Sequence, residues 1–485
     1  MVNVKILMMI LMFCGASGFS FSQEAKGPSD FLSADFHQKR RELLRKRMPS
    51  NSVAVFFSSP VKKMSNDVDY LYHPDRDFYY LTGYREPDAV LLVFKAPQKT
   101  ESGEKYTELI FVRPHSPYSE AWEGPRLGVD GTVEKLKIQK VLSNRDFKDY
   151  NLDFDQFDRI YFYDFAPFER YTFFNVFLSD LISDFKKKIG FGPEKMNGDP
   201  SKNNLDRINL KDFMIDLRGI KTKEELQLLK KAVEISCVGQ VEVMKAMKPG
   251  MSEREVQGIH EFVSHKYGAE AQGYPSIVGS GKNSCILHYF DNHKPEIGSE
   301  DLVLMDVGAQ YRGYSADVTR TIPSDGTFSP EQKAIYELVL KAQEAAIKQC
   351  VAGESWKKPQ ATAEQIIGQG LVALGIIDHP DKAGRYAPHG ISHHIGLDVH
   401  DRGRTGLFES GMVITVEPGI YIPEGADCDE KWWNIGVRIE DCIVIKNFGK
   451  PEVLSSMAPK TVAEIEEMMK QSSVFDQFVL PDLDK

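Results

Sequence analysis

The segment LVLMDVGAQYRGYSADVTRT, residues 302–321, decides the fold of the C-terminal half of this chain. Apolar and β-branched residues flank a turn sequence at 311–314, which is typical of two short β-strands joined as a hairpin. Each strand carries an aspartate, Asp306 or Asp317, and an ionised carboxylate within an apolar strand is costly without a positive partner. The segment therefore predicts a hairpin whose two acids need a cation.

Two registers of this hairpin are possible. If the loop is centred between residues 311 and 312, Asp306 lies directly opposite Asp317. If the loop is centred one residue later, Asp306 faces Thr319 and Asp317 is its diagonal neighbour. Both registers place the two carboxylates on one face of the sheet. A single aspartate near a strand end more often caps a turn or faces water, so the rest of the chain must decide whether a metal binds here.

Composition bounds the class of protein. At 485 residues the chain is too long for one ordinary core, and its 42% hydrophobic and 27% charged residues are typical of a soluble globular protein. The net charge of −10 lacks the excess of positive charge that is typical of nucleic-acid-binding proteins, so we expect no nucleic-acid partner. We predict five segments: a signal peptide at 1–22, an α/β domain at 33–195, a linker at 196–218, an α+β domain at 219–472 and a C-terminal tail at 473–485.

The N-terminus resembles a secretory signal peptide, with an apolar run at 6–13 and a Ser-Phe-Ser site at 20–22. Cleavage would leave Gln23 at the new terminus, and we expect a secreted or periplasmic protein with no stable membrane span. The alternatives are a retained anchor, or a lipoprotein acylated on Cys14, which Phe13 disfavours. The five later cysteines are sparse and lack metal-binding spacing, so the fold should not depend on disulfides.

Strand and helix patterns alternate in the N-terminal half, which indicates an α/β domain. We predict strands at 52–57, 89–95, 109–113 and 159–163 and helices at 36–48 and 174–188. A polar and aromatic cluster of Glu120, Trp122, Gly124 and Arg126 could line a site. The composition fits an ordinary surface loop at least as well. The polar, turn-rich stretch 197–204 approaches the domain boundary.

Two helices should open the second domain. Thr222 and Glu225 have capping-box spacing and predict a helix that continues to about Met247. Ser252 and Glu255 predict the start of the next helix in the same way. A helix pair that leads into strands indicates an α+β domain.

Further acids and histidines occur near predicted strands of this domain. His288 lies in a strand-like pattern at 286–289, where a single histidine is more often structural. Four histidines fall within the stretch 389–400, interrupted by apolar residues, as in metal sites and proton shuttles. Glu417 ends an apolar strand pattern, and period-2 alternation places Arg438 and Glu440 together on one face. Glu440 could form a plain ion pair with Arg438 or bind a metal.

The strand-placed carboxylates are Asp306, Asp317, Glu417 and Glu440. A set rich in carboxylates and free of cysteine suits manganese or cobalt better than structural zinc. Bridging carboxylates imply two ions about 3.5–4 Å apart, which generate hydroxide near neutral pH. These residues predict metal-assisted hydrolysis.

The same motifs resemble the pita-bread metallopeptidases and, within them, the Xaa-Pro aminopeptidases, also called aminopeptidases P. The motifs are LMDVG at 304–308, SADVTRT at 315–321, the stretch 389–400, VEPG at 416–419 and RIED at 438–441. Residues 75–87 and Trp122-Glu123-Gly124 are similar to that family's non-catalytic domain. The resemblance implies an α+β fold, in which a pita-bread catalytic domain follows an α/β domain of the creatinase and aminopeptidase P type.

The resemblance also implies residue roles. Asp317 and Glu440 would bridge two metals, Asp306 would hold one metal, and His393 with Glu417 would hold the other. The implied rim residues are His288, His389 and His400, which bind substrate and shuttle protons, and Arg438, which supports a ligand. Glu417 would also act as general base, and we assign no role to His394.

The implied reaction is attack of a metal-bridging hydroxide on the peptide bond before a proline at position two. The cofactors would be two divalent ions, Mn²⁺ first, with Co²⁺ or Zn²⁺ possible. The partners would be peptides that begin with Xaa-Pro and other copies of the chain, as a dimer or tetramer. The nearest alternative is prolidase, which cleaves only Xaa-Pro dipeptides, and a further alternative is a metal-free binding protein on the same fold.

Overall fold

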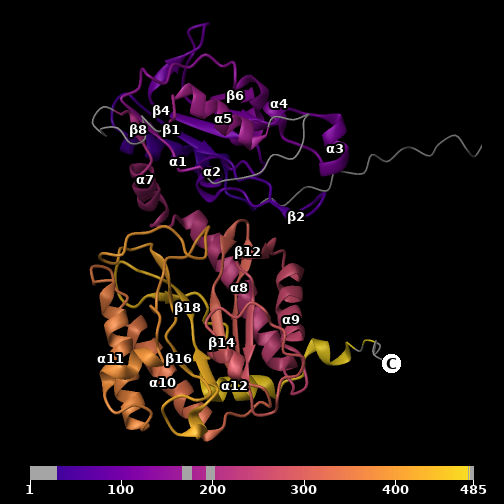
Figure 1. Ribbon diagram of the computed structural model, residues 1–485, viewed down its shortest axis with the longest axis vertical. Helices are drawn as coiled ribbons and strands as arrows, with labels where there is room; N and C mark the ends of the chain where they lie inside the picture. Colours follow the sequence, from indigo (N-terminus) through magenta and orange to yellow (C-terminus); the bar gives the residue numbers. More distant parts are fainter. Residues whose placement is uncertain (1–29, 166–176, 193–202, 479, 481–485) are drawn as a thin grey trace, which may run out of the picture. The chain divides into compact units, whose positions relative to one another are not determined.

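The computed structural model describes residues 30–165, 177–192, 203–478 and 480 (Figure 1). A six-stranded mixed sheet in strand order β6-β5-β4-β1-β7-β8 forms the N-terminal part. Its strands are β1 (Ser52–Phe57), β4 (Val90–Lys99), β5 (Lys105–Val112), β6 (Lys140–Ser143), β7 (Arg159–Tyr161) and β8 (Leu205–Asp206). The β1–β4 and β4–β5 pairs are antiparallel, whereas β1–β7, β5–β6 and β7–β8 are parallel.

Helices and a small hairpin complete this part. The helices are α1 (Ala34–Arg47), α2 (Arg76–Thr82), α3 (Pro117–Glu123), α4 (Gly128–Leu136) and α5 (Leu178–Lys188), and the hairpin is β2 (Lys63–Ser65) with β3 (Val68–Asp69). Helix α7 (Asn209–Arg218) follows β8, so ordered structure occupies the described part of the predicted linker. By their contacts, residues from Leu32 onward form one compact unit. The domain boundaries drawn from the sequence stay predictions.

In the C-terminal part, Figure 1 shows strands between two pairs of helices. The helices are α8 (Lys223–Ala246), α9 (Glu253–Lys266), α10 (Pro330–Ile347), α11 (Lys357–Ala373) and α12 (Val462–Met469). Helix α8 packs on β12 (Ala309–Tyr311), β13 (Tyr314–Ser315) and β14 (Val318–Pro323). Helix α10 packs on β15 (Val413–Val416), β16 (Gly419–Ile422) and β17 (Ile435–Arg438). The remaining strands are β9 (Ala271–Gln272), β10 (Ile277–Ser280), β11 (Leu302–Val307), β18 (Asp441–Val444) and β19 (Glu452–Val453).

The predicted helix caps are confirmed. The Thr222 side chain accepts a hydrogen bond from the Glu225 amide, and the Glu225 carboxylate accepts one from the Thr222 amide. Ser252 and Glu255 exchange the same two bonds. These reciprocal bonds satisfy amides that the first turn of a helix leaves free, so the two helices begin where the sequence placed them.

One strand prediction is wrong. Residues 286–289 form a turn after the short 3-10 helix η3 (Gly281–Cys285) and belong to no strand. Ile286 is exposed there, so its apolar side chain is no sign of a buried strand.

Several sequence predictions fall partly or wholly outside the described residues. These are the signal peptide and Cys14, residues 174–176 of a predicted helix, and most of the boundary stretch 197–204. Among the described residues, no helix is long and apolar enough to span a membrane. The five described cysteines are free thiols, in agreement with a fold that does not depend on disulfides.

Candidate metal centre

The hairpin adopts the second of the two registers. Tyr311 pairs with Tyr314, and Arg312 and Gly313 between them both have positive φ angles, 50° and 88°. This is the geometry of a two-residue turn that matches the twist of the strands. Asp306 consequently pairs with Thr319, and Asp317 precedes β14 as its diagonal neighbour.

Asp306 and Asp317 share one hydroxyl group. The Tyr274 hydroxyl lies 2.5 Å from Asp306 Oδ1 and 2.6 Å from Asp317 Oδ1. A hydroxyl has one proton and can donate to only one of these carboxylates at a time. Arg438 also donates to Asp306 Oδ2 over 2.5 Å. The Tyr274 hydroxyl thus brings the two carboxylates together, and their role as ligands of a cation stays a prediction.

His393 and Glu417 approach from the loop after α11 and from the end of β15. His393 Nε2 lies 3.4 Å from Asp317 Oδ2 and 3.2 Å from Glu417 Oε1. Its Nδ1 lies 3.0 Å from the His394 carbonyl oxygen, which accepts a hydrogen bond when Nδ1 carries the proton. That tautomer leaves the lone pair of Nε2 directed at the carboxylates, as a metal-binding imidazole requires.

The clearest structural sign of a metal site comes from Glu440. Its side chain is buried, with 1% of the residue exposed, and its Oε2 accepts a hydrogen bond from the Thr319 hydroxyl over 2.7 Å. Its Oε1 is buried and has no hydrogen-bond partner among the described residues. A buried carboxylate oxygen without a partner is costly. Ligand atoms of Asp317, His393 and Glu440 all lie within 4.8 Å of one another, so one ion could satisfy this oxygen.

The electrostatics of the cluster agree with this interpretation. Burial, followed by the charge of Asp306, raises the pKa of Asp317 to about 6. Burial and the charges of Asp317 and Glu417 raise the pKa of Glu440 well above its ordinary value. For Asp306, burial acts in the same direction, but the charge of Arg438 and the hydrogen bonds from Tyr274 and Arg438 together outweigh it and lower the pKa. The protein alone does not balance so many buried acids, and divalent cations would.

Three histidines occupy the rim of the cluster in different ways. His389 Nε2 lies 2.8 Å from the Tyr421 hydroxyl, whereas the His400 ring meets the His393 ring edge-on at a centroid distance of 4.4 Å. The exposed His288 stacks on Phe290. Partial burial, with charges nearby, lowers the pKa values of His389 and His400. His389 and His400 therefore hold a proton less readily than free imidazoles do.

The sequence reasoning missed two tyrosines. Tyr274 joins the two aspartates, and Tyr421 accepts a hydrogen bond from Arg438 over 2.9 Å while its hydroxyl contacts His389. Neither lies in a motif of acids or histidines, and a tyrosine on a buried strand such as β16 is an ordinary core residue. The buried side chain of His394 stacks on Trp356 and lies outside the cluster, although its carbonyl oxygen contacts His393.

The polar and aromatic cluster of the N-terminal half lies elsewhere. Glu120 and Trp122 lie on α3, where Trp122 is 79% exposed. Arg126 is buried and donates to Glu123 over 2.9 Å. None of these residues contacts the acidic cluster within the described structure.

A buried set of carboxylates with one imidazole, carried on strands between helix pairs, defines a metal-dependent hydrolase. Comparison with known proteins identifies the family. Residues 227–447 match the model of metallopeptidase family M24, and residues 37–156 match that of the aminopeptidase P N-terminal domain. The chain belongs to metallopeptidase family M24 and carries an aminopeptidase P N-terminal domain. It is an enzyme of the hydrolase class, and the fold expected from the resemblance is confirmed.

The similar proteins span almost the whole chain. The Xaa-Pro aminopeptidase of Haemophilus influenzae is 35% identical over 453 residues, which are 90% of this chain and 98% of that protein. The Escherichia coli Xaa-Pro aminopeptidase is 35% identical over 460 residues, with the same coverage. The structure of Pseudomonas aeruginosa aminopeptidase PepP superposes with a TM-score of 0.80 at 33% identity, covering 90% of this chain and 98% of that one.

Proposed function

We propose that this protein is a metal-dependent Xaa-Pro aminopeptidase, which releases the first residue of peptides with proline at position two. The observation that carries the proposal is the partnerless buried Oε1 of Glu440 among the acids and imidazole described above. The near-complete coverage of proteins named Xaa-Pro aminopeptidases favours this function over prolidase.

The residues that would hold two divalent ions are Asp306, Asp317, His393, Glu417 and Glu440. When bound, such ions lower the pKa of water and polarise a peptide carbonyl group. Asp317, His393 and Glu440 would form the core of this set, since their ligand atoms all lie within 4.8 Å of one another. A carboxylate-rich set favours Mn²⁺. Co²⁺ and Zn²⁺ are the alternatives, and a zinc-substituted E. coli aminopeptidase P has been solved with product.

Glu417 is the proposed general base. The Thr415 hydroxyl donates to its Oε1 over 3.2 Å and holds the carboxylate at the end of β15. From there it can accept the proton of the attacking water. His288, His389 and His400 would bind substrate and hold or pass on protons, and Arg438 would keep Asp306 oriented through its 2.5 Å hydrogen bond.

We also propose that the protein is exported and that it forms a homo-oligomer. Export rests on the leader-like sequence at 1–22. Oligomer formation is supported by exposed apolar side chains on and beside the β2–β3 hairpin and on α3, namely Met64, Val68, Tyr70, Leu71, Tyr118 and Trp122. Sedimentation of the purified protein tests the second proposal, and a strictly monomeric species would contradict it.

The function is tested with a panel of peptides and added Mn²⁺, Co²⁺ or Zn²⁺. We expect release of the first residue from Xaa-Pro-Xaa peptides. Hydrolysis restricted to Xaa-Pro dipeptides would instead indicate prolidase. Failure to bind any divalent ion would favour a binding protein.

A further inference from the structure

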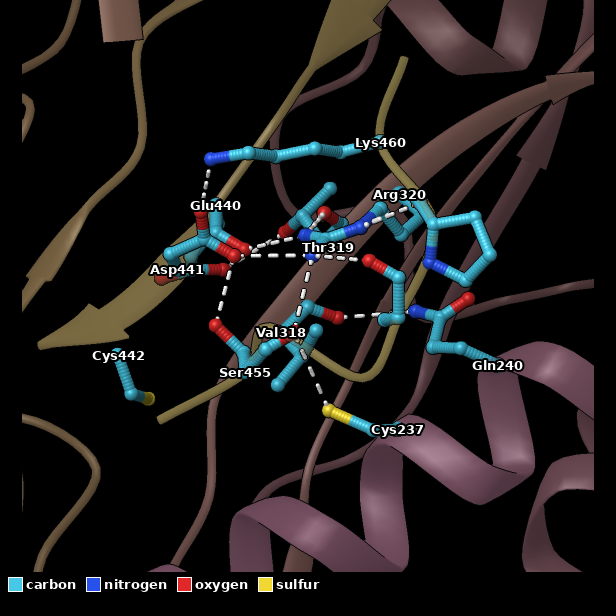
Figure 2. Close-up of polar contacts among 12 residues, drawn as sticks. Cys237, Gln240, Val318, Thr319, Arg320, Glu440, Asp441, Cys442, Ser455 and Lys460 are labelled. Atoms are coloured by element: carbon cyan, nitrogen blue, oxygen red, sulfur yellow. Dashed lines mark hydrogen bonds and ion pairs between the residues drawn. The ribbon is translucent and has the colours of Figure 1, made fainter. Parts of the chain in front are cut away.

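A fully buried arginine lies directly behind the acidic cluster. Arg320, on β14, has no exposed side-chain surface. Figure 2 shows its guanidinium group beside the main chains of Thr319 and Glu440 and the carboxylate of Asp441. It donates to the Thr319 carbonyl over 2.9 Å, to the Glu440 carbonyl over 2.6 Å and to Asp441 Oδ1 over 2.9 Å. Three further carbonyl oxygens accept from it: Pro459 at 2.9 Å, Ala458 at 3.0 Å and Ser455 at 3.4 Å.

Both carboxylate oxygens of Asp441 have hydrogen-bond partners, whereas Oε1 of its neighbour Glu440 has none among the described residues. Besides Arg320, its oxygens accept from the Ser455 hydroxyl at 2.6 Å, from Gln343 at 2.8 Å and from Lys460 at 2.8 Å. Burial would raise the pKa of Asp441, but Arg320 and Lys460 outweigh it and lower the pKa far below its ordinary value. The charge of Asp441 is therefore balanced by two positively charged side chains, and its carboxylate faces away from the metal site.

Arg320 ties together two strands that belong to different sheets. Strand β14 pairs with β11, whereas β18 pairs with β15 and β19. The main-chain amide of Glu440 donates to the Thr319 carbonyl over 3.1 Å, and Arg320 binds that carbonyl as well. Because Asp317 directly precedes β14 and Glu440 directly precedes β18, the separation of these strands sets the separation of the two central acids.

We propose that Arg320 is a positioning residue of the metal centre, which fixes Glu440 relative to Asp317 through their main chains. The inference rests on the proposed function only in that the acids bind metal. The planar guanidinium has five N–H donors and reaches six acceptors around it, which one lysine ammonium group cannot do. The change Arg320→Lys keeps a positive charge near Asp441 but removes bonds to the carbonyl groups.

The test measures metal binding by the full chain after chelation and dialysis. For Arg320→Lys we expect manganese affinity, measured by calorimetry, to fall about 10- to 100-fold, as for other residues that orient metal ligands. The visible absorption of bound Co²⁺, which reports ligand geometry, should change as well. Neither readout responds to a general loss of stability that leaves the site intact.

Arg41→Lys is the matched control. Arg41 is also buried, forms two hydrogen bonds to Glu108 at 2.6 and 3.0 Å and donates to the carbonyl groups of Leu81 and Lys137, but it lies on α1 in the N-terminal part. This control should lower the Tm comparably while leaving manganese affinity and the cobalt spectrum unchanged.

Manganese affinity within twofold of wild type and an unchanged cobalt spectrum in Arg320→Lys would overturn the inference. If that variant does not fold, Lys460→Met replaces it, since the Lys460 side chain is 23% exposed and its loss leaves Arg320 alone to neutralise Asp441. We then expect severalfold weaker manganese binding, and unchanged binding would again overturn the inference. A wild-type protein that binds metal but does not cleave proline peptides would refute the proposed function alone.

Discussion

At the scale of single residues, adjacent acids of this chain have opposite environments. Glu440 has a buried oxygen without a partner in the described structure. Asp441 instead accepts hydrogen bonds from four side chains, those of Arg320, Lys460, Ser455 and Gln343. Alternation along the chain separates the two side chains, so one belongs to the metal site and the other to its support. The chemistry of the site depends on this division.

Replacement of Glu417 tests the assigned base. Glu417→Gln keeps the shape of the side chain but cannot accept a proton, so we expect kcat to fall by roughly 100- to 10,000-fold. Circular dichroism should show an unchanged fold. Glu424→Gln, at an exposed position after β16, is the control and should retain full activity. Turnover close to wild type in Glu417→Gln would show that another group accepts the proton.

The acids of the site could be predicted from the sequence because each lies within or directly beside an apolar strand pattern, where an ionised group is costly without a positive partner. Asp306, Asp317, Glu417 and Glu440 share this signal. Tyr421 and Thr319 do not, because hydroxyl-bearing residues on buried strands are ordinary, and neither does Tyr274, which lies in a bend between β9 and β10. Their roles depend on distances across separate elements, which only the folded chain provides.

At the scale of elements, the hairpin of β12 and β13 fixes the register on which the site depends. Two residues in the turn have positive φ, so Asp306 faces Thr319 and not Asp317. The sequence left both registers open because a turn of tyrosine, arginine and glycine does not define its own centre. Capping boxes were a clearer signal, since reciprocal bonds mark where α8 and α9 begin.

A pair of glycine substitutions tests the turn. Gly313→Ala places a side chain at φ +88°, which should cost about 1–2 kcal/mol and lower the Tm. Gly258→Ala, at an exposed position within α9 where a new Cβ meets no neighbour, should raise stability by about 0.5–1 kcal/mol. The same chemical change is thus expected to act in opposite directions in thermal unfolding. A Gly313→Ala protein as stable as wild type would argue against a strained turn.

At the scale of the whole molecule, a buried arginine joins the two parts of the chain. Arg218, at the end of α7, binds Asp77 of the N-terminal part over 2.7 Å and Asp398 over 2.7 Å, and it also contacts Asp401. Asp398 and Asp401 flank His400 on the rim of the site. The N-terminal sheet is therefore linked to the loop that carries a proposed substrate-binding histidine, a connection between distant segments that the sequence pattern did not indicate.

Stability of the whole chain should also depend on pH through His37. Burial, opposed by the hydrogen bond to the Tyr80 carbonyl, lowers the pKa of His37 from 6.5 to about 4. As the pH falls, His37 is protonated in the unfolded chain before it is protonated in the folded protein. The free energy of unfolding therefore decreases as the pH falls from 6.5 toward 4. By pH 5.5 the loss should be about 1 kcal/mol.

The variant His37→Asn isolates this effect, because asparagine can still donate to the Tyr80 carbonyl but does not titrate. We expect its Tm to decrease less than that of wild type between pH 7.5 and 5.5. His379→Asn, at a side chain that is 65% exposed, should follow wild type. Identical pH dependence in all three proteins would contradict the assignment to His37.

The most direct test of the central proposal is hydrolysis of an Xaa-Pro-Xaa peptide by the full protein before and after removal of metal. We predict release of the first residue by the metal-loaded protein, loss of this activity on chelation, and its return when Mn²⁺ is added. Undiminished hydrolysis in the chelated protein, with metal analysis showing no bound ion, would contradict the proposal that these five side chains form a catalytic metal centre.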